Sequence, residues 1–263
     1  KGEIFDEYKG KKLVKEELDG IKIIRTGIYA TKEKSFTKRL KNYLSFTFSS
    51  VLQGMKQVGK QDVVITESPP LFLGWSGYVI SKKIGAKFIF NVSDLWPESA
   101  IKLGVLHNKL LIIMSTWLEE FCYRKAAAVT GQTQGIVDNI VQRGFGKDKV
   151  HLITNGVDTG FFKKENRDES FRKEINIEDK FAVCYAGIHG IAQGLEVIIK
   201  AADILRDEKG IQFVFVGDGP EKKMLMDMVR KRKLENVLFL PVQPKPKMPR
   251  IIASMDATVI PLK

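Results

Sequence analysis

Residues 181–202 read FAVCYAGIHGIAQGLEVIIKAA, an apolar strand followed by a glycine-rich loop and a helix. In open α/β sheets, ligands bind beyond the carboxyl ends of the strands. A helix N-terminus placed there offers free N–H groups and the positive end of its dipole, and glycines let a phosphate approach closely. The stretch therefore predicts a phosphate site at Gly187, Gly190 and Gly194, although glycines after a strand can also serve only to turn the chain.

The alternation of strand and helix continues toward the C-terminus. The strand IQFVFVG at 211–217 leads into the loop GDGPEK and a helix over 221–231; NVLFL, a short helix near 248–254 and ATVIP follow. Neither loop has the G-x-G-x-x-G spacing of a nicotinamide-cofactor fingerprint. Gly187, Gly190 and Gly194 are spaced differently, and in the second loop Lys222 stands where the third glycine would fall. We expect residues 179–263 to form a truncated α/β domain, because complete doubly wound domains run to roughly 100–150 residues.

The upstream half shows the same organisation. Strand-like runs at 62–66, 87–92, 127–131 and 149–154 alternate with helical patterns at 71–83, 109–123 and 134–142. Runs such as VVI and FIF are apolar at consecutive positions, which predicts a parallel sheet with helices on both faces. The polar stretch after Asn155 has no clean period. We therefore expect an N-terminal domain over 1–160, a linker over 161–178 and a second domain over 179–263.

Two elements precede the first of these strands. Residues 12–29 form two strand-like runs joined by Asp19-Gly20, a dipeptide typical of a tight hairpin turn. From 36 to 57, large apolar residues recur at three- and four-residue spacings, which predicts an amphipathic helix with lysines and an arginine on its other face. Such a helix could lie on an anionic membrane or cover its own sheet.

Composition limits the class of protein. The chain has 263 residues, 44% of them apolar, which suits two domains with real cores. Its formal charge of +12 attracts phosphate-rich ligands or anionic membranes. No apolar run reaches the roughly 18 residues of a membrane span. Cys122 and Cys184 lie in apolar segments without metal-ligand spacing, so we expect buried thiols in a reducing, cytoplasmic compartment. The positive charge and the basic segment 36–57 would allow a peripheral position on the inner face of the plasma membrane.

Few residues have the character of catalytic groups. In the segment DLWPES, Asp94 and Glu98 follow a buried strand, and Asp94 could hold an acceptor hydroxyl. The alternative is that Trp96 fills a core and Glu98 caps a helix. Of the three histidines, we expect His151 in the core, whereas His189 lies in the glycine loop and could donate to a phosphate. DxD, HExxH, GxSxG and P-loop motifs do not occur, so no metal or cofactor is expected.

Four motifs follow one another along the chain: ESPPLFLGWSGYVISKKIGAKFIFNVSDLWPESAIKLGVL, HLITNGVD, YAGIHGIAQGLEVIIKAA and FVGDGPE. Together they resemble family-4 glycosyltransferases of the GT-B fold, over nearly all of residues 23–263. Within that family they resemble the branch that transfers amino sugars or deoxy sugars in O-antigen, capsule or exopolysaccharide assembly. The resemblance implies two Rossmann-like doubly wound parallel-sheet domains facing a cleft, both incomplete in this chain. It also implies retaining, metal-independent transfer of a sugar from a nucleotide-sugar donor, favouring UDP, to a glycan or lipid-linked acceptor in cell-surface polysaccharide synthesis.

The resemblance also assigns the candidate site residues. The donor diphosphate would lie at the first glycine loop, and the nucleoside would lie at the second loop and the strand that follows it. Asp94 and Glu98 would belong to the acceptor side. The donor and phosphate group is Gly187, His189, Gly190, Gln193 and Gly194; the nucleoside group is Gly217, Gly219, Glu221, Leu240 and Val242.

The chain departs from the family pattern at several positions, and two other functions are compatible with its sequence. Many relatives have histidine where this chain has Ser93, and Arg and Lys where it has Ile188 and Gln193. Family segments upstream of the hairpin and downstream of IPLK are not in this sequence, so we expect poor transfer by the chain alone. A nucleotide-sugar epimerase of the same fold is an alternative. A nucleic-acid-binding protein is a weaker one, since the basic residues do not cluster beside aromatics.

Overall fold

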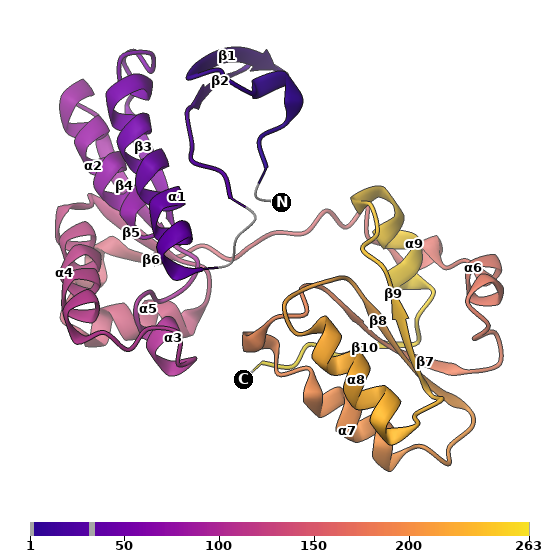
Figure 1. Ribbon diagram of the computed structural model, residues 1–263. Coiled ribbons are helices and arrows are strands. Elements are labelled where there is room, and N and C mark those ends of the chain that lie inside the picture. The colour runs from indigo at the N-terminus through magenta and orange to yellow at the C-terminus, as the bar shows by residue number, and fades with distance from the viewer. Residues whose placement is uncertain (1–2, 32–34, 263) are drawn as a thin grey trace. The chain divides into compact units, whose positions relative to one another are not determined.

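The computed structural model of the chain describes residues 3–31 and 35–262 (Figure 1). The chain forms two compact units, unit 1 over Lys1–Asn155 and unit 2 over Gly156–Lys263. Each unit has its own parallel sheet and its own core. Mixed α/β architecture with parallel sheets is therefore confirmed for both halves of the chain.

Unit 1 begins with a short 3₁₀ turn, η1 (Asp6–Tyr8), and the predicted hairpin, β1 (Leu13–Leu18) and β2 (Ile21–Thr26). Asp19 and Gly20 both have positive φ, 51° and 78°, so the turn has the twist that antiparallel strands favour. Hydrogen bonds attach the hairpin to the next helix: Thr26 Oγ1 lies 3.0 Å from Ser49 Oγ, and Asn42 Nδ2 donates to the Tyr29 carbonyl at 2.6 Å.

The helix predicted over 36–57 is present and ends a few residues earlier. It consists of α1 (Phe36–Ser49) and a π-helical turn, η2 (Ser50–Gly54). α1 packs against α2, with the Phe48 and Trp75 rings edge to face at 5.9 Å. The prediction for this segment is confirmed as far as Gly54.

The sheet of unit 1 has four parallel strands in the order β3-β4-β5-β6. The connecting helices alternate with the strands, as the sequence predicted. Its buried core contains Phe90, Tyr123, Val129 and Ile140. The elements are β3 (Val63–Ser68), α2 (Phe72–Ile84), β4 (Lys87–Val92), α3 (Glu98–Lys102), α4 (Lys109–Lys125), β5 (Ala128–Gly131), α5 (Gln134–Gln142), η3 (Lys147–Lys149) and β6 (Val150–Leu152).

Among the described residues, no helix covers the second face of this sheet at β3, so the predicted double coverage is wrong for that strand. Side chains alternate across a strand, and in β3 the residues Val63 and Ile65 are 41% and 68% exposed. Apolar residues at consecutive positions therefore do not establish double coverage here. His151, expected in the core, is also exposed, because only Val150 of β6 faces inward.

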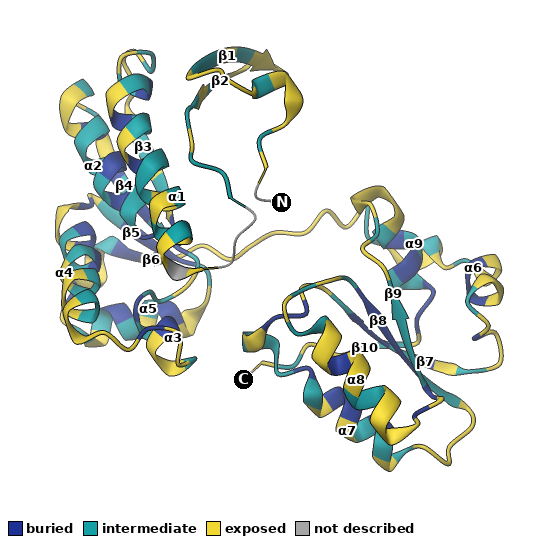
Figure 2. Cartoon of the chain, in the orientation of Figure 1, coloured by how far each residue is buried: buried dark blue, intermediate teal, exposed yellow. Residues whose placement is uncertain are grey.

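Unit 2 has a second parallel sheet, in the order β10-β7-β8-β9. Both of its faces are covered, as Figure 2 shows in the dark blue of β8. One core lies against α7 and α8, and the other contains Cys184, Val214 and Ile251. The elements are η4 (Lys164–Asn166), α6 (Glu169–Glu174), β7 (Phe181–Ala186), η5 (Ile191–Gln193), α7 (Glu196–Ile204), β8 (Ile211–Val216), α8 (Lys222–Arg232), β9 (Val237–Leu240), η6 (Lys245–Lys247), α9 (Met248–Ala253) and β10 (Ala257–Thr258).

The segment 161–178, expected as a linker, contains α6, which packs within unit 2. Arg172 of α6 is almost fully buried, with 3% of its side chain exposed. Its guanidinium donates to the carbonyls of Ser254, Ile177 and Lys180 at 2.8, 3.0 and 2.5 Å. It also pairs with Asp256 at 3.1 Å. These bonds join α6 to the residues just before β10 and to the residues just before β7.

The structure also shows the surroundings of the two cysteines and the character of the helices. Cys122 and Cys184 are both free and buried, as predicted. In the described part of the chain, no helix combines the length and the apolar character needed to cross a bilayer.

Candidate functional site

The loops after β7 and β8 lie at one edge of the sheet of unit 2, because these parallel strands are neighbours. Backbone hydrogen bonds join the two loops. The His189 N–H donates to the Asp218 carbonyl at 2.9 Å, and the Glu221 N–H donates to the His189 carbonyl at 3.0 Å. The glycines that the sequence placed in separate motifs therefore form one backbone cradle at the carboxyl ends of the strands.

Glycine is required where these loops cross. A Cβ on Gly219 would lie 2.3 Å from the His189 carbonyl oxygen, closer than real Cβ atoms come. A Cβ on Gly217 would lie 2.0 Å from the Gly187 carbonyl oxygen, and Gly217 also has a φ of 138°. The glycines thus do more than turn the chain, because they allow two backbones to pack in direct contact.

His189 is fully buried, with its ring among the rings of Tyr185, Phe215 and Phe239 at centroid distances of 6.0, 6.0 and 6.1 Å. Neither ring nitrogen has a hydrogen-bond partner among the described residues. Burial, with a smaller contribution from the Lys222 charge, lowers the pKa of His189 from its usual 6.5. The ring is therefore held neutral, and its predicted donation to a phosphate would require this loop to open.

Lys222 supplies a cation at the glycine loops, although it was not among the predicted donor-site residues. It is the first residue of α8, and its Nζ donates to the carbonyls of Gly217 at 2.8 Å and Leu240 at 3.4 Å. Glu221, just before it, is half-buried, and its Oε2 is buried without a partner within residues 3–31 and 35–262. Of the two predicted base contacts, Leu240 is half-buried at the end of β9 and Val242 is exposed.

The helix after the first loop begins at Glu196, two residues later than predicted. Gly194 has a left-handed φ of 55°, and no side chain caps the helix start. The amides of Val197 and Ile198 bond back to the carbonyls of Gly194 and Leu195, both at 3.1 Å. The amides of Gly190 and Gln193 also bond within the loop, to the carbonyls of Ile188 at 3.0 Å and Gly190 at 3.2 Å, so a phosphate held by these two amides would replace those bonds.

A second set of polar groups lies at the carboxyl edge of the sheet of unit 1. Ser93 Oγ donates to the Glu67 carboxylate, Gln132 Nε2 donates to Ser93 Oγ at 2.5 Å, and Asn155 Nδ2 donates to Gln132 Oε1 at 2.9 Å. Glu67 lies near the end of β3, and the other three residues follow β4, β5 and β6, the neighbouring strands of the sheet. We call Glu67, Ser93, Gln132 and Asn155 the strand-end chain. These four residues stand at strand ends, where the sequence predicts ligand binding, but the predicted site groups did not include them.

Asp94 and Glu98, the predicted catalytic pair, lie next to the strand-end chain in sequence but have different surroundings. Asp94 is exposed and accepts a hydrogen bond from Ser99 at 3.0 Å. Glu98 begins α3, pairs with Lys102 at 2.6 Å and accepts from Asn139 at 3.1 Å. The hydrogen bond from Lys102 holds the Glu98 pKa below its usual value. Trp96 packs against the core of unit 1.

Among the residues that the structure describes, no three His, Cys, Asp or Glu side chains gather as ligands for a metal ion.

Comparison with known proteins gives the chain its family. A model of the glycosyl transferase 4-like domain matches residues 10–156, and one of the glycosyl transferases group 1 matches residues 151–263. WcaI of Escherichia coli K12, named as a colanic acid biosynthesis glycosyl transferase, is 27% identical over 253 residues, covering 94% of this chain and 62% of WcaI. Alpha-D-kanosaminyltransferase of Streptomyces kanamyceticus is 27% identical and covers 70% of this chain and 49% of the relative.

Solved structures share the fold at low sequence identity. HepE of Anabaena in complex with UDP has a TM-score of 0.62 at 17% identity, covering 82% of this chain and 57% of HepE. A UDP-forming alpha,alpha-trehalose-phosphate synthase of Burkholderia xenovorans has a TM-score of 0.71 at 11% identity, covering 96% and 70% of the two chains. The chain spans about half to three-fifths of the length of the curated relatives it matches.

Proposed function

The chain belongs to the glycosyl transferase 4-like family, and from that premise we propose that it moves a sugar from a UDP-linked donor to a glycan or lipid-linked acceptor in cell-surface polysaccharide synthesis. The name of WcaI, a colanic acid biosynthesis glycosyl transferase, supports the polysaccharide class. The UDP complex of HepE supports the carrier, on a shared fold.

The crossing of the two glycine loops carries this proposal. It brings backbone N–H groups, the start of α8 and the Lys222 ammonium to one edge of the sheet of unit 2. Such a cradle suits a diphosphate, because amides and a cation compensate its charge without a bulky side chain in the way. Gly187, Gly190, Gln193, Gly194 and the backbone of His189 would surround the diphosphate. Gly217, Gly219, Glu221, Leu240 and Val242 would surround the nucleoside.

In the proposed reaction, the bond between the anomeric carbon and the leaving phosphate oxygen breaks as the acceptor oxygen bonds to the same face of the sugar. The acceptor proton passes to the departing phosphate oxygen, and the anomeric configuration is retained. Negative charge grows on the diphosphate in the transition state, where the loop amides and Lys222 stabilise it. This assigns the stabilising charge to the chain itself and not to a metal ion.

We place acceptor binding in unit 1. Asp94 is exposed, and the strand-end chain aligns a carboxylate, a hydroxyl and two amides along four strands. Groups of this kind recognise sugar hydroxyls, which both donate and accept hydrogen bonds. Glu98 is committed to Lys102 and Asn139, so in this proposal it positions the segment around Asp94.

We propose a cytoplasmic location, with peripheral contact to anionic membrane through the segment 36–57. Arg39, Lys41 and Lys56 are exposed on this segment, together with the apolar side chains of Phe48 and Leu52, which are 52% and 67% exposed. Basic and apolar groups on one helix suit the headgroup region of a bilayer.

Calorimetry with UDP, ADP, GDP and dTDP tests the donor site. We expect UDP to bind with one-to-one stoichiometry and more tightly than the others. Gly219→Ala should weaken UDP binding by at least about tenfold, because its methyl forces the crossing loops apart. Lys222→Met should weaken UDP binding by a similar factor through the loss of one charge-assisted contact.

Gly156→Ala is the matched control, since a Cβ there would meet nothing within 4 Å. It should bind UDP like the unaltered chain. Urea unfolding of each variant separates a lost site from a lost fold. Absence of nucleoside diphosphate binding, or equal binding by Gly219→Ala and Gly156→Ala, would refute the donor site.

A further inference from the structure

The outer face of α4 has a continuous row of exposed apolar side chains. Leu110, Ile113, Met114 and Trp117 follow the i, i+3, i+4, i+7 spacing of one helix face and are 64, 65, 57 and 61% exposed. We call these four residues the α4 stripe. On a surface helix such a stripe normally faces the core, and exposed apolar patches of this kind mark interaction sites. In Figure 2 the exposed residues along α4 are yellow.

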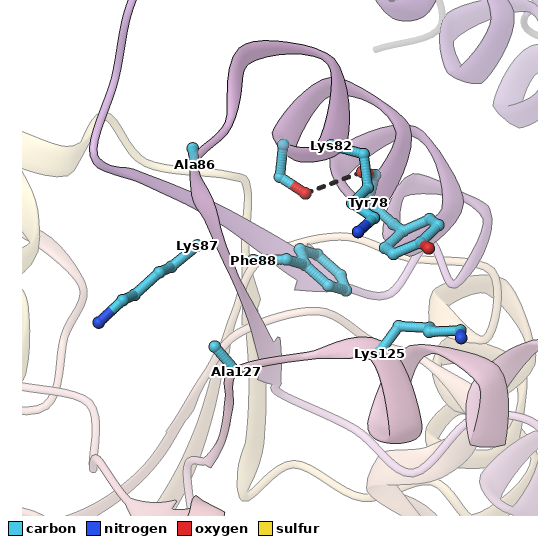
Figure 3. Close-up of a pocket in the computed structure, with 8 residues that line it drawn as sticks. Tyr78, Lys82, Ala86, Lys87, Phe88, Lys125 and Ala127 are labelled. Atoms are coloured by element: carbon cyan, nitrogen blue, oxygen red, sulfur yellow. Dashed lines mark hydrogen bonds between the residues drawn. The ribbon is translucent and has the colours of Figure 1, made fainter.

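A row of aromatic rings leads from the α4 stripe into unit 1. Trp117 stacks on Phe121 at 5.6 Å, Phe121 meets Tyr78 edge to face at 5.1 Å, and Tyr78 meets Phe88 at 6.2 Å. Tyr78 and Phe88 line a pocket of about 280 Å³ at the end of α4 (Figure 3). The α4 stripe is therefore continuous with this pocket through packed rings.

Lysines dominate the charge of that pocket. Lys82, Lys87 and Lys125 line it, and no acidic residue is among the described residues that do so. The acidic side chains of α4 are already paired, Glu119 with Arg143 at 2.7 Å and Glu120 with Arg124 at 3.1 Å. We call the three lysines the lysine rim.

The lysine rim does not converge on one point. Figure 3 shows the Lys87 and Lys125 side chains extending to opposite sides of the pocket, away from each other. Ammonium groups spread in this way do not chelate a single small anion. They match a plane of anionic headgroups, where each lysine meets a different phosphate.

We propose that the α4 stripe and the lysine rim form a docking surface for an anionic bilayer. The stripe would enter the boundary between headgroups and acyl chains, with Trp117 at the interface and the lysines on lipid phosphates. A contact with a second copy through the α4 stripe would offer the lysine rim neither Glu119 nor Glu120, because these carboxylates already pair with Arg143 and Arg124. The inference extends the proposed function by naming a surface for its membrane partner, separate from the segment 36–57.

Vesicle co-sedimentation tests this surface. The chain should bind vesicles of mixed phosphatidylcholine and phosphatidylglycerol, bind weakly to phosphatidylcholine alone, and be released by salt. The triple variant Leu110→Ser, Ile113→Ser, Trp117→Ser should lose at least about tenfold in binding. The triple variant Lys82→Gln, Lys87→Gln, Lys125→Gln should lose about a hundredfold in binding, since each basic group near such a surface contributes about 1 kcal/mol and 1.4 kcal/mol is about tenfold.

Controls keep the outcomes separate. Ile204→Ser, at a residue 82% exposed on α7, and Lys200→Gln with Lys231→Gln carry the same chemistry in unit 2 and should bind vesicles normally. Lys41→Gln with Lys56→Gln measures the separate contribution of the segment 36–57. UDP titration of every variant shows whether a lost membrane contact is distinct from a lost donor site.

Fluorescence gives an independent readout. The emission of Trp117, taken as the difference between the unaltered chain and Trp117→Phe, should shift to the blue on phosphatidylglycerol vesicles. Failure to bind anionic vesicles, or full binding by the stripe variant, overturns the proposal. Dimerisation that the stripe variant abolishes, seen by sedimentation velocity, would assign the stripe to a second copy and overturn it as well.

Discussion

His189 combines burial with the absence of a hydrogen-bond partner for its ring among the described residues. Its backbone, in contrast, makes both bonds that join the glycine loops. The ring therefore acts as an apolar plug beneath the cradle, in contact with Tyr185, Phe215 and Phe239. A plug of this kind keeps the loops in register only while the imidazole is neutral.

The free energy of unfolding should therefore depend on pH through His189. Its pKa is lowered in the folded chain, so the unfolded chain binds the proton more readily, and the stabilising effect is complete above a pH of about 6.5. It is lost as the pH falls from that value toward the folded pKa, by at most about tenfold in the unfolding equilibrium constant per pH unit. Urea unfolding at a series of pH values measures this slope.

His189→Gln should have a shallower slope than the unaltered chain below that pH, whatever its absolute stability. His151→Gln, at an exposed position, should keep the full slope. Because acid titration of the carboxylates is common to all three proteins, the difference between them isolates His189. Identical slopes in the three proteins would contradict this account of the plug.

The strand, glycine loop and helix around Gly187 could be predicted from sequence because each depends on neighbours in the chain. The role of Lys222 could not, since its amine reaches Gly217 and the end of β9, a strand separated by a whole helix. The same holds for Glu67, which meets Ser93 only through the pairing of β3 with β4. Register between strands decides such contacts, and the residue pattern of one strand does not encode it.

The helix α6 shows how a short helix acquires a fixed position. Six residues form too few intrahelical bonds to be stable alone. Its order comes from Arg172, which binds three backbone carbonyls and Asp256, and from Phe171, which is buried in the core of unit 2. The sequence around it lacks a period, which led to the expectation of a linker, because one buried arginine leaves no trace in a hydropathy pattern.

Arg172→Met should destabilise unit 2 by about 3 kcal/mol, because it leaves buried carbonyls and a carboxylate without their donor. Urea unfolding followed by circular dichroism measures the loss. Lys173→Met, at the exposed neighbouring position, should change the free energy of unfolding by less than about 0.5 kcal/mol. Equal effects of the two substitutions would show that the network around Arg172 does not stabilise α6.

The chain folds as two units with separate cores. All three tryptophans, Trp75, Trp96 and Trp117, lie in unit 1, whereas the proposed donor site lies in unit 2. Tryptophan emission therefore reports one unit, and circular dichroism reports both.

UDP should stabilise only the unit that binds it. At a concentration about 100-fold above its Kd, a ligand adds about 2.7 kcal/mol to the free energy of unfolding of the unit it binds. We expect that shift in the unfolding of unit 2, which changes the circular dichroism signal but not the tryptophan emission. A matching shift of the emission transition would mean that the units unfold together or that UDP binds unit 1.

Cys122 and Cys184 give the chain a further property, because one buried thiol lies in each unit. Burial raises the pKa of both thiols to about 12, so neither forms a thiolate at neutral pH while its unit is closed. A thiol reagent added to the native protein can then modify each cysteine only when its surroundings open. Peptide mapping of the labelled residues over time would give a separate opening rate for each half of the chain, without any engineered probe.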